Sequence, residues 1–448
     1  MTPPGGAKSL KHRIRRAHPL RFPMRRTLDA LDHADATRIK GFQEKRLRAL
    51  VRVAAARAPF YREYFRTSGI DPRDIRTLED LALLPLISRT DLAERAEDFL
   101  VYPRKLMWAA RSSGTSGAPI ASYRTMGSSV YELSVLERQW GWFGLPADSK
   151  RVVLRGSDFA ADQDGKPTQL LPGARQLMVS SFHLTPEHLG DILDEIRRFA
   201  PDAIEGWPSS IALLAALLRE QGEKVPVTAI ITSSEVMTPG QIALMRDVFA
   251  GPIVDHYGQT ERVTMAGSCE AGSFHVFPDY GIVELHPVDG SDTRWEIVGT
   301  ALHNWGFPLF RYRTGDEVGP AATGPCACGR SYELLGAIDG RVEDSFTAAD
   351  GRLLPLPSTI IDDLDGLREA QIAQLAPGRF EVRVVPGDGY DADATMAHAR
   401  RNVDRMFGAD QILTLKEFDR LQRPASGKLK SAVVENAVPT PTSGPVPE

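Results

Sequence analysis

The sequence of 448 residues predicts an α/β protein with a large domain and a smaller α+β domain at its C-terminal end. Short apolar segments typical of strands alternate with longer segments whose apolar residues recur at helical spacing. This alternation is typical of βαβ units and therefore of mostly parallel or mixed sheets. After Gly340 the pattern changes, because a strand with alternating apolar residues and one long helix follow.

The individual elements are assigned from these periodicities. Helical spacing covers residues 36–56, 128–142, 186–199, 209–221 and 238–249. Two short apolar runs, residues 151–154 and 229–231, predict strands of the parallel sheet. In the C-terminal part, residues 379–385 predict a strand and residues 392–407 predict a helix.

The chain divides into four segments. Residues 1–34 form a basic arm, with eight lysine or arginine residues among the first 26, and we expect this arm to be solvated. Residues 35–339 form the large domain, and residues 340–437 form a small domain that we expect to act as a mobile lid. The Pro-rich segment 438–448 is expected to be disordered.

The composition is ordinary for a globular enzyme, with 42% apolar and 25% charged residues. A net charge of −4 gives no chain-wide attraction to nucleic acid. No apolar stretch approaches the ~18 residues that a membrane helix needs, and the N-terminus lacks the apolar segment of a signal peptide. We therefore expect a cytoplasmic protein without nucleic-acid or membrane partners, and a homodimer is a candidate assembly.

Residues 111–119, Arg-Ser-Ser-Gly-Thr-Ser-Gly-Ala-Pro, form the most informative motif. Glycines permit turns in which successive backbone amides converge on an anion, and the hydroxyl groups add further donors. The candidate phosphate-binding residues are Ser112, Ser113, Gly114, Thr115, Ser116 and Gly117. The motif lacks the Gly-Lys-Ser/Thr end of a Walker A loop, so a P-loop NTPase is excluded. Taken alone, such a segment is more often a plain flexible loop.

Four further motifs with chemistry suited to a nucleotide follow along the chain. Residues 257–261, Tyr-Gly-Gln-Thr-Glu, follow an apolar strand and offer a ring for a base, a hydroxyl for a phosphate and a carboxylate for Mg²⁺. Residues 312–316 end in a carboxylate that can accept both ribose hydroxyls. Residues 340–344, Gly-Arg-Val-Glu-Asp, and residues 426–430, Ser-Gly-Lys-Leu-Lys, complete the series.

With these motifs in this order, residues 35–435 resemble the adenylate-forming superfamily of acyl-CoA synthetases. Residues 58–63 and 84–89 are typical of its phenylacetate-CoA ligase-like branch. The resemblance implies a large adenylate-forming domain with a mobile lid. It also implies ATP-dependent activation of a carboxylic acid to an acyl-adenylate with release of pyrophosphate, followed by transfer to coenzyme A with release of AMP. We therefore expect an AMP-forming acid–thiol ligase that uses ATP, Mg²⁺ and coenzyme A.

The resemblance also assigns roles to residues of this chain. Beside the phosphate loop, the nucleotide-binding residues would be Ser234, Glu235, His256, Tyr257, Gly258, Gln259, Thr260, Asp316 and Arg341. Glu261 would hold Mg²⁺, and Glu343 would act as the hinge of the lid, where the family commonly has aspartate. Lys428 would be the catalytic cation, because a fixed ammonium group stabilises charge that moves between the carboxylate, the α-phosphate and the pyrophosphate.

Two features concern the reactants. The family usually has a lysine where this loop has Ala118, and either Arg124 supplies the missing cation or the loop relies on its amides and Mg²⁺. Trp207 and His256 are candidates for the substrate pocket. Together with Trp140 and Trp142, they suggest a flat apolar acid, such as an aromatic one, although core packing is an equally good reading of each tryptophan.

The three cysteines give a separate signal, since an odd number argues against a disulfide framework. Cys269, Cys326 and Cys328 with His275 make a Cys₃His set of the kind that structural zinc prefers. Ordinary reduced cysteines are the alternative.

Two other functions remain open from the sequence. An adenylating ligase could pass the acyl group to an amine or to the thiol of a carrier protein. A degenerate homologue would bind the nucleotide without turnover, and Ala118 is the sequence feature that favours this reading.

Overall fold

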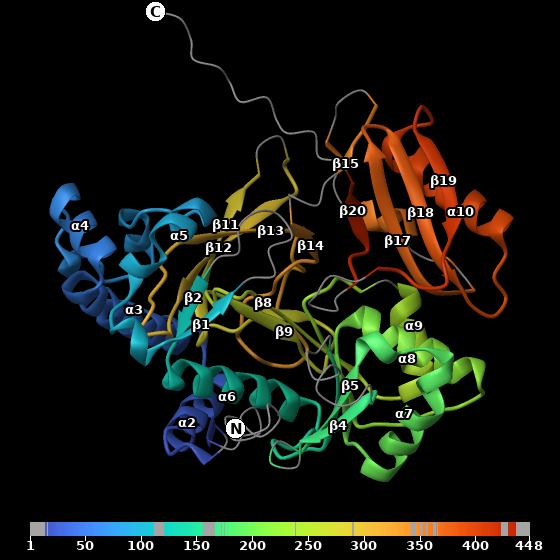
Figure 1. Ribbon diagram of the computed structural model, residues 1–448. Coiled ribbons are helices and arrows are strands. Elements are labelled where there is room, and N and C mark those ends of the chain that lie inside the picture. Colours follow the sequence, from blue (N-terminus) through green and yellow to red (C-terminus); the bar gives the residue numbers. More distant parts are fainter. Residues whose placement is uncertain are drawn as a thin grey trace, which may run out of the picture.

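The computed structural model describes residues 14–435 except 16, 112–120, 156–165, 172, 174, 238, 289–290, 342–345, 350–352, 355–356, 362–363, 365 and 423–428. A large domain is built on an eight-stranded and a four-stranded sheet, and a C-terminal domain is built on a second four-stranded sheet (Figure 1). The predicted phosphate-loop residues Ser112 to Gly117, the predicted hinge residue Glu343 and the predicted catalytic residue Lys428 lie outside the described residues.

The eight-stranded sheet has the order β10-β9-β8-β7-β6-β3-β5-β4. Its parallel centre consists of β3 (Arg151–Arg155), β5 (Gln176–Ser180), β6 (Ala203–Gly206), β7 (Ala229–Ser233) and β8 (Ile253–Gly258). Its antiparallel edges are β4 (Thr168–Leu171), β9 (Met265–Ser268) and β10 (Phe274–Val276). The predicted α/β class is therefore confirmed, with a mixed sheet whose interior is parallel.

Helices α7 (Pro186–Phe199), α8 (Pro208–Glu220) and α9 (Pro239–Phe249) connect these strands, close to where the sequence predicts them. Residues 208–218 of α8 are all buried. The helix is buried on every side because it packs against α7, α9 and the sheet and also contacts the C-terminal domain. Its largely apolar sequence fits this burial.

The long helix α6 (Met126–Trp142) begins at a capping box in which Thr125 and Ser128 satisfy each other's backbone amides. Helix α2 (Arg21–Asp32) packs along it, with Leu28 and Leu31 in the core (Figure 1). Arg21 of α2 forms an ion pair with the buried Glu137 of α6. The expectation of a solvated arm is therefore wrong for residues 21–32, since a partner far along the chain buries one face of this basic segment.

The tryptophans of α6 belong to the core rather than to a substrate pocket. Trp140 is 2% exposed and packs with Val254 and Ile231 of the sheet. Trp142 packs edge-on against Phe277. Of the two readings that the sequence leaves open, core packing holds for both residues.

The remaining part of the large domain lies beyond α6. Helices α3 (Ala36–Arg57), α4 (Pro59–Ser68) and α5 (Arg89–Arg95) pack beside the sheet β11-β12-β13-β14 (Figure 1). Its strands are β11 (Gly281–Pro287), β12 (Trp295–Ala301), β13 (Tyr312–Val318) and β14 (Ile338–Arg341). Strands β1 (Trp108–Arg111) and β2 (Ala121–Arg124) form a separate antiparallel pair. Short 3₁₀ helices occur at Pro72–Asp74, Glu79–Leu83, Ala96–Phe99, Arg104–Leu106, Ser181–His183 and Pro357–Ile361.

The C-terminal domain is an α+β unit, as the sequence predicts. Its sheet has the order β19-β18-β17-β20, from β17 (Leu367–Ala376), β18 (Arg379–Pro386), β19 (Ile412–Glu417) and β20 (Ala432–Val434). Helix α10 (Ala392–Phe407) covers a core that includes Phe346 and Phe380, and a short pair joins β15 (Phe346–Thr347) to β16 (Leu353–Leu354). In Figure 1 this domain lies above α8 and α9.

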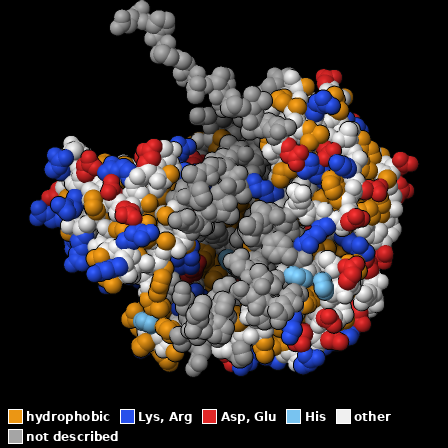
Figure 2. Space-filling model, viewed as in Figure 1, with side chains coloured by type: hydrophobic (Ala, Val, Ile, Leu, Met, Phe, Trp, Pro, Cys, Tyr) orange, Lys and Arg blue, Asp and Glu red, His pale blue; other side chains and the backbone are white. Residues whose placement is uncertain are grey.

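The surface and helices show the character expected from the composition. Basic and acidic side chains are intermixed over the described part of the face seen in Figure 2. Among the described residues, no helix combines the length and apolar character needed to cross a bilayer.

Candidate nucleotide site and metal cluster

The parallel strands bring several predicted residues to one edge of the large sheet. Gly206 at the end of β6 is level with Thr232 of β7, and Ser233 is level with His256 of β8. The segments that follow β6, β7 and β8 therefore leave the sheet at the same edge, where ligands of α/β proteins usually bind. Trp207, Ser234 and Glu235, and Tyr257 to Glu261 all lie in or next to these segments. The sequence motifs thus converge in space.

A hydrogen bond joins the two sheets of the large domain at this edge. The Tyr257 hydroxyl donates to Oδ2 of Asp316 on β13 at 2.7 Å. Burial and the neighbouring Asp316 charge raise the pKa of Tyr257 well above its ordinary value, so the hydroxyl stays protonated and acts as the donor. Gln259 donates from Nε2 to the Tyr257 hydroxyl at 2.6 Å and fixes the ring orientation.

Asp316 is a buried carboxylate, 7% exposed, with a defined neighbour on the next strand. The antiparallel register of β13 and β14 places Asp316 opposite Arg341. Three residues predicted for the nucleotide, Tyr257, Asp316 and Arg341, are therefore brought to one place by contacts between β8, β13 and β14.

The segment after β8 is tied to the ends of the phosphate loop. The Thr260 carbonyl accepts hydrogen bonds from Oγ of Ser122 at 2.9 Å and from Nη2 of Arg124 at 3.0 Å. Arg111 and Ala121 are register partners in β1 and β2, so the loop between them leaves and returns at one place. This place lies beside Thr260.

Glu261, the predicted Mg²⁺ ligand, is held from the second sheet. It is 4% exposed, and its Oε1 accepts a hydrogen bond from the Tyr312 hydroxyl at 3.0 Å. One carboxylate oxygen is thus oriented by the protein. A hard carboxylate next to a phosphate loop is the type of ligand that Mg²⁺ prefers.

Ser234 and Glu235 follow β7 in a strained turn. Ser234 is exposed and has a φ of 71°, in the left-handed region. Glu235 accepts hydrogen bonds from the backbone N and from Oγ of Ser209 at 2.8 and 3.1 Å, so it caps the start of α8. Trp207, the residue before α8, is half-buried. The nucleotide and substrate roles of these residues stay predictions.

One charged pair of this region is not anticipated from the sequence. Arg262, directly after Glu261, forms an ion pair with Glu132 of α6. The charge is visible in the sequence, but its partner lies on a helix that precedes it by more than a hundred residues. A local pattern therefore gives no signal that the side chain is buried.

The predicted cysteine cluster is assembled in the structure. The ligand atoms of Cys269, His275, Cys326 and Cys328 all lie within 4.8 Å of one another. The Sγ atoms of Cys269 and Cys326 are 3.7 Å apart, and Sγ of Cys328 is 3.4 Å from Nε2 of His275. Nδ1 of His275 donates to the Tyr332 carbonyl at 3.1 Å, which leaves Nε2 as the ligand atom.

The thiols of the cluster differ in their surroundings. Burial raises the pKa of Cys269 to about 11. Burial also opposes ionisation of Cys326, but hydrogen bonds from the Cys328 backbone and from Ser273 and His275 lower its pKa to about 6. All three cysteines are free thiols in the structure.

Several known proteins resemble this chain in sequence. No protein-family model matches the chain. The phenylacetate-coenzyme A ligase of Thermus thermophilus is 25% identical over 346 residues, which cover 72% of this chain and 77% of that enzyme. The phenylacetate-coenzyme A ligase of Aromatoleum evansii is 25% identical over 377 residues, covering 75% and 78%. The chain is therefore similar in sequence to phenylacetate-CoA ligases.

Solved structures show the same relationship at the level of the fold. A 2-hydroxyisobutyryl-CoA ligase in its postadenylation state matches with a TM-score of 0.72 at 18% identity, over 91% of this chain and 92% of that one. The same ligase in its thioesterification state matches over the same fractions, 91% of this chain and 92% of that one, at 18% identity and with a TM-score of 0.55. The adenylate-forming fold is confirmed, and the postadenylation structure gives the higher TM-score of the two.

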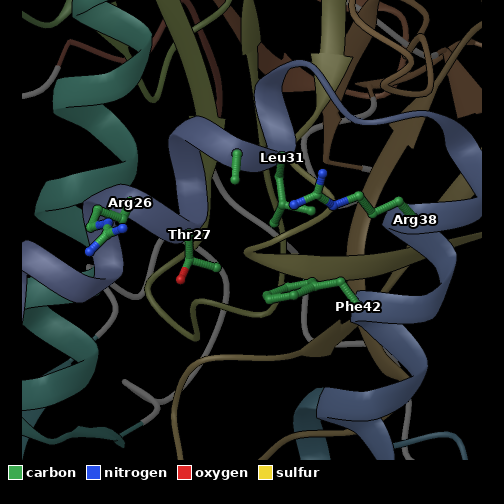
Figure 3. A pocket seen from close by; sticks show the side chains of 6 residues that line it. Arg26, Thr27, Leu31, Arg38 and Phe42 are labelled. Carbon is green, nitrogen blue, oxygen red and sulfur yellow. The ribbon is translucent and has the colours of Figure 1, made fainter.

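Two cavities lined by described residues lie outside the candidate nucleotide site. One, of about 290 Å³, lies between α2 and α3 and is lined by residues that include Arg26, Leu31, Arg38 and Phe42 (Figure 3). The other, of about 600 Å³, borders the turn that carries Cys326. Neither contains a residue predicted to bind nucleotide, so the site rests on hydrogen bonds and strand register.

Proposed function

We propose that this chain activates a carboxylic acid with ATP and transfers the acyl group to coenzyme A. The observation that carries the proposal is the convergence of Tyr257, Asp316 and Glu261 beside the ends of the phosphate loop. The relationship to phenylacetate-CoA ligases and the shared fold support it.

The first half-reaction joins the acid to the α-phosphorus of ATP. A carboxylate oxygen attacks that phosphorus, the bond to the bridging oxygen of the β-phosphate breaks, and pyrophosphate leaves. Asp316 would accept hydrogen bonds from the ribose hydroxyls, and Glu261 would hold Mg²⁺, which neutralises charge on the phosphates. Lys428 would place an ammonium group next to the reacting oxygens, where charge shifts.

The second half-reaction transfers the acyl group. The coenzyme A thiolate attacks the acyl carbon, the bond between that carbon and the phosphate oxygen breaks, and AMP leaves. We propose that the C-terminal domain rotates between the two half-reactions, with Glu343 in the hinge. The position of Trp207 and His256 at the carboxyl edge of the sheet supports an aromatic acid as the substrate, with both residues lining its pocket.

A screen of carboxylic acids tests this function. Pyrophosphate release is measured with ATP and Mg²⁺ for phenylacetate, benzoate and a set of aliphatic acids, with and without coenzyme A. Release with one acid and a thioester product when coenzyme A is present is expected. Amide formation with an added amine, or transfer to a carrier protein, would instead support the alternative ligases. Binding of ATP without pyrophosphate exchange for any acid would indicate the degenerate homologue.

We further propose that the cysteine cluster binds one structural zinc ion. Zinc–sulfur bonds of about 2.3 Å in a tetrahedral site place two sulfur atoms about 3.8 Å apart. The 3.7 Å between Sγ of Cys269 and Sγ of Cys326 agrees with this spacing and greatly exceeds the ~2.05 Å of a disulfide. Four protein ligands leave no position for water, so the ion would hold the structure together rather than catalyse.

Removal of one ligand tests the zinc proposal. We expect about one zinc per chain in purified protein by elemental analysis, and Cys328→Ser should lose the metal and lower the melting temperature, because metal binding is coupled to folding. Ser331→Ala, an exposed change close to Cys326 and Cys328 in sequence, serves as the matched control and should keep the metal. Metal-free protein of full stability would overturn the proposal.

Cytoplasmic location and a homodimer stay predictions for this chain.

A further inference from the structure

The residue directly after the proposed Mg²⁺ ligand has no role in the mechanism above. Arg262 is 7% exposed and pairs with Glu132 through Nη2. Its Nε and Nη1 atoms have no hydrogen-bond partner among the residues that the structure describes. Its φ of 59° lies in the left-handed region, which strains any residue that carries a Cβ. Two buried donors on a strained residue at a reaction site suggest a ligand.

Arg124, at the end of β2, contacts the same segment. Its Nη2 donates to the Thr260 carbonyl, and its Nε also lacks a partner within the described part of the chain. Burial and, next, the positive charge of Arg262 lower the pKa of Arg124, so the two guanidinium groups lie close enough to repel each other. Guanidinium groups are, as a class, charged at neutral pH.

The nearby carboxylates do not balance these charges. Glu132 is the partner of Arg262 and also acts on Arg124. Arg15 of the N-terminal arm is a third guanidinium group, and its pKa is lowered by burial despite the attraction of Glu132 and of Glu137, which is itself paired with Arg21. Glu261 is the other carboxylate near Arg124, and in the proposed function its charge is committed to Mg²⁺.

The other titratable groups near this pair carry no negative charge. Burial lowers the pKa of His303 to about 3, so the ring is neutral, and repulsion from Arg262, Arg46 and Arg124 acts in the same direction. Burial raises the pKa of Tyr280 well above its usual range, so its hydroxyl is protonated. Positive charge therefore exceeds negative charge among the described groups, and buried unbalanced charge is costly unless an anion compensates it.

We propose that Arg262 and Arg124 together bind an anionic oxygen group of the reactants. The inference rests on the proposed function for the identity of that group. A phosphate of ATP is favoured, because Arg124 stands on the strand that leaves the phosphate loop and both residues flank Thr260. The pair would supply the positive charge that the loop does not have at Ala118. The carboxylate of the acid has the same chemistry and is the second source.

A neutral replacement of the ion pair tests this site. The double variant Glu132→Gln and Arg262→Gln removes both charges, so that no unpaired charge stays buried. The matched control is Arg21→Gln with Glu137→Gln, which neutralises another arginine–glutamate pair on the same helix α6. Arg124→Gln is a further variant that breaks no ion pair among the residues that the structure describes. Melting temperatures verify that each variant folds.

Calorimetry measures dissociation constants for Mg-ATP, AMP, inorganic pyrophosphate and the acid identified in the screen. For the double variant we expect the constants of Mg-ATP and pyrophosphate to rise at least about tenfold, as for lost charge-assisted hydrogen bonds, and that of AMP to change less than about twofold. Arg124→Gln should act in the same direction, and the Arg21/Glu137 control should not.

The outcomes separate this inference from the proposed function. Weaker binding of the acid, with an unchanged dissociation constant for Mg-ATP, would support the anion site and assign it to the substrate carboxylate. Unchanged binding of all four ligands in folded variants would overturn it and leave Arg262 a structural partner of Glu132. The proposed function is decided separately, by pyrophosphate release from the unmodified protein. If that release is absent, binding of inorganic pyrophosphate still decides whether the arginine pair is an anion site.

Discussion

An ion pair across the two domains provides the most direct test of the proposed domain rotation. Arg368, at the start of β17, contacts Glu220, the last residue of α8, through Nε at 2.8 and 3.1 Å and through Nη2 at 2.5 Å. The two side chains are 27% and 14% exposed. Gly387, directly after β18, packs against the pair, since a Cβ at this position would lie 3.2 Å from Glu220 Oε1.

The magnitude follows from this geometry. Two unit charges at about 4 Å attract by about 4 kcal/mol at an effective dielectric constant of 20. Desolvation and side-chain ordering offset most of this attraction, and fully exposed ion pairs contribute only about 0.2–1 kcal/mol to stability. For a bidentate, half-buried pair we expect about 1–2 kcal/mol, which corresponds to roughly 5–30-fold in the equilibrium between domain arrangements. Arg368→Gln should shift that equilibrium away from the arrangement seen here.

We propose that the domain arrangement seen here serves the adenylation half-reaction. Single-turnover pyrophosphate release should slow roughly 5–30-fold, whereas thioester formation from a preformed acyl-adenylate should not slow. The charge swap Glu220→Arg with Arg368→Glu should restore most of the loss. Arg383→Gln, which breaks an ion pair with Glu435 inside the C-terminal domain, is the matched control. An equal loss in both half-reactions, or no recovery in the swap, would refute the reasoning.

Three further predictions concern single residues. Asp316→Ala should raise the ATP dissociation constant by roughly 30–150-fold, through loss of two charge-assisted hydrogen bonds, and Tyr257→Phe should have a smaller effect; an unchanged constant in calorimetry would exclude the ribose role. Lys428→Ala should abolish adenylation but retain thioester formation from a preformed acyl-adenylate, and equal loss of both would contradict a role in one half-reaction. Because burial lowers the pKa of His303 to about 3, the unfolded chain takes up a proton below about pH 6.5 that the folded protein does not, so stability should fall by about 2 kcal/mol from pH 7 to pH 5. Chemical unfolding of His303→Gln should lack this part of the pH dependence, and an unaltered slope would show that another group causes it.

Helices with a clear local period were predictable from the sequence. Helix α7 spans Pro186–Phe199 as predicted, because Pro186 suits the first turn and four apolar residues line one face. Helix α8 was found within one residue at each end, although it is buried on every side. Local propensity suffices in both cases because it agrees with the tertiary environment.

Contacts between distant residues were not predictable in the same way. The basic N-terminal arm looked solvated, yet Arg21 pairs with Glu137, which lies 116 residues further along the chain. Arg138 is buried against Asp279 at a separation of 141 residues. A charged residue in a sequence shows its own hydration preference but not the partner that offsets it.

In the candidate site, too, local motifs were predictable and contacts between distant residues were not. Tyr257, Asp316 and Glu261 were named from short motifs, because each residue type has its own chemistry. The hydrogen bond that joins Tyr257 to Asp316 depends on the packing of two sheets and was not predicted. The cysteine cluster was predicted because every cysteine of the chain belongs to it. Arg262 was missed because arginine is common at surfaces and its burial is a tertiary property.

The cysteine cluster and the nucleotide strand are mechanically connected. Strand β8, which ends at Tyr257 and Gly258, pairs with β9, and β9 pairs with β10, which carries His275. Cys269 directly follows β9, so a bound ion would hold β9 and β10 at both their connection and their edge.

A second connection runs from the cluster to helix α6. The Tyr332 carbonyl accepts a hydrogen bond from His275, and the Tyr332 hydroxyl accepts one from Arg138 of α6 at 3.2 Å. The same helix carries Glu132, which holds Arg262 beside Thr260 and Glu261. Loss of a bound ion should therefore act first on stability and only then on nucleotide affinity, because the cluster's contacts among the described residues lead to the supports of the site.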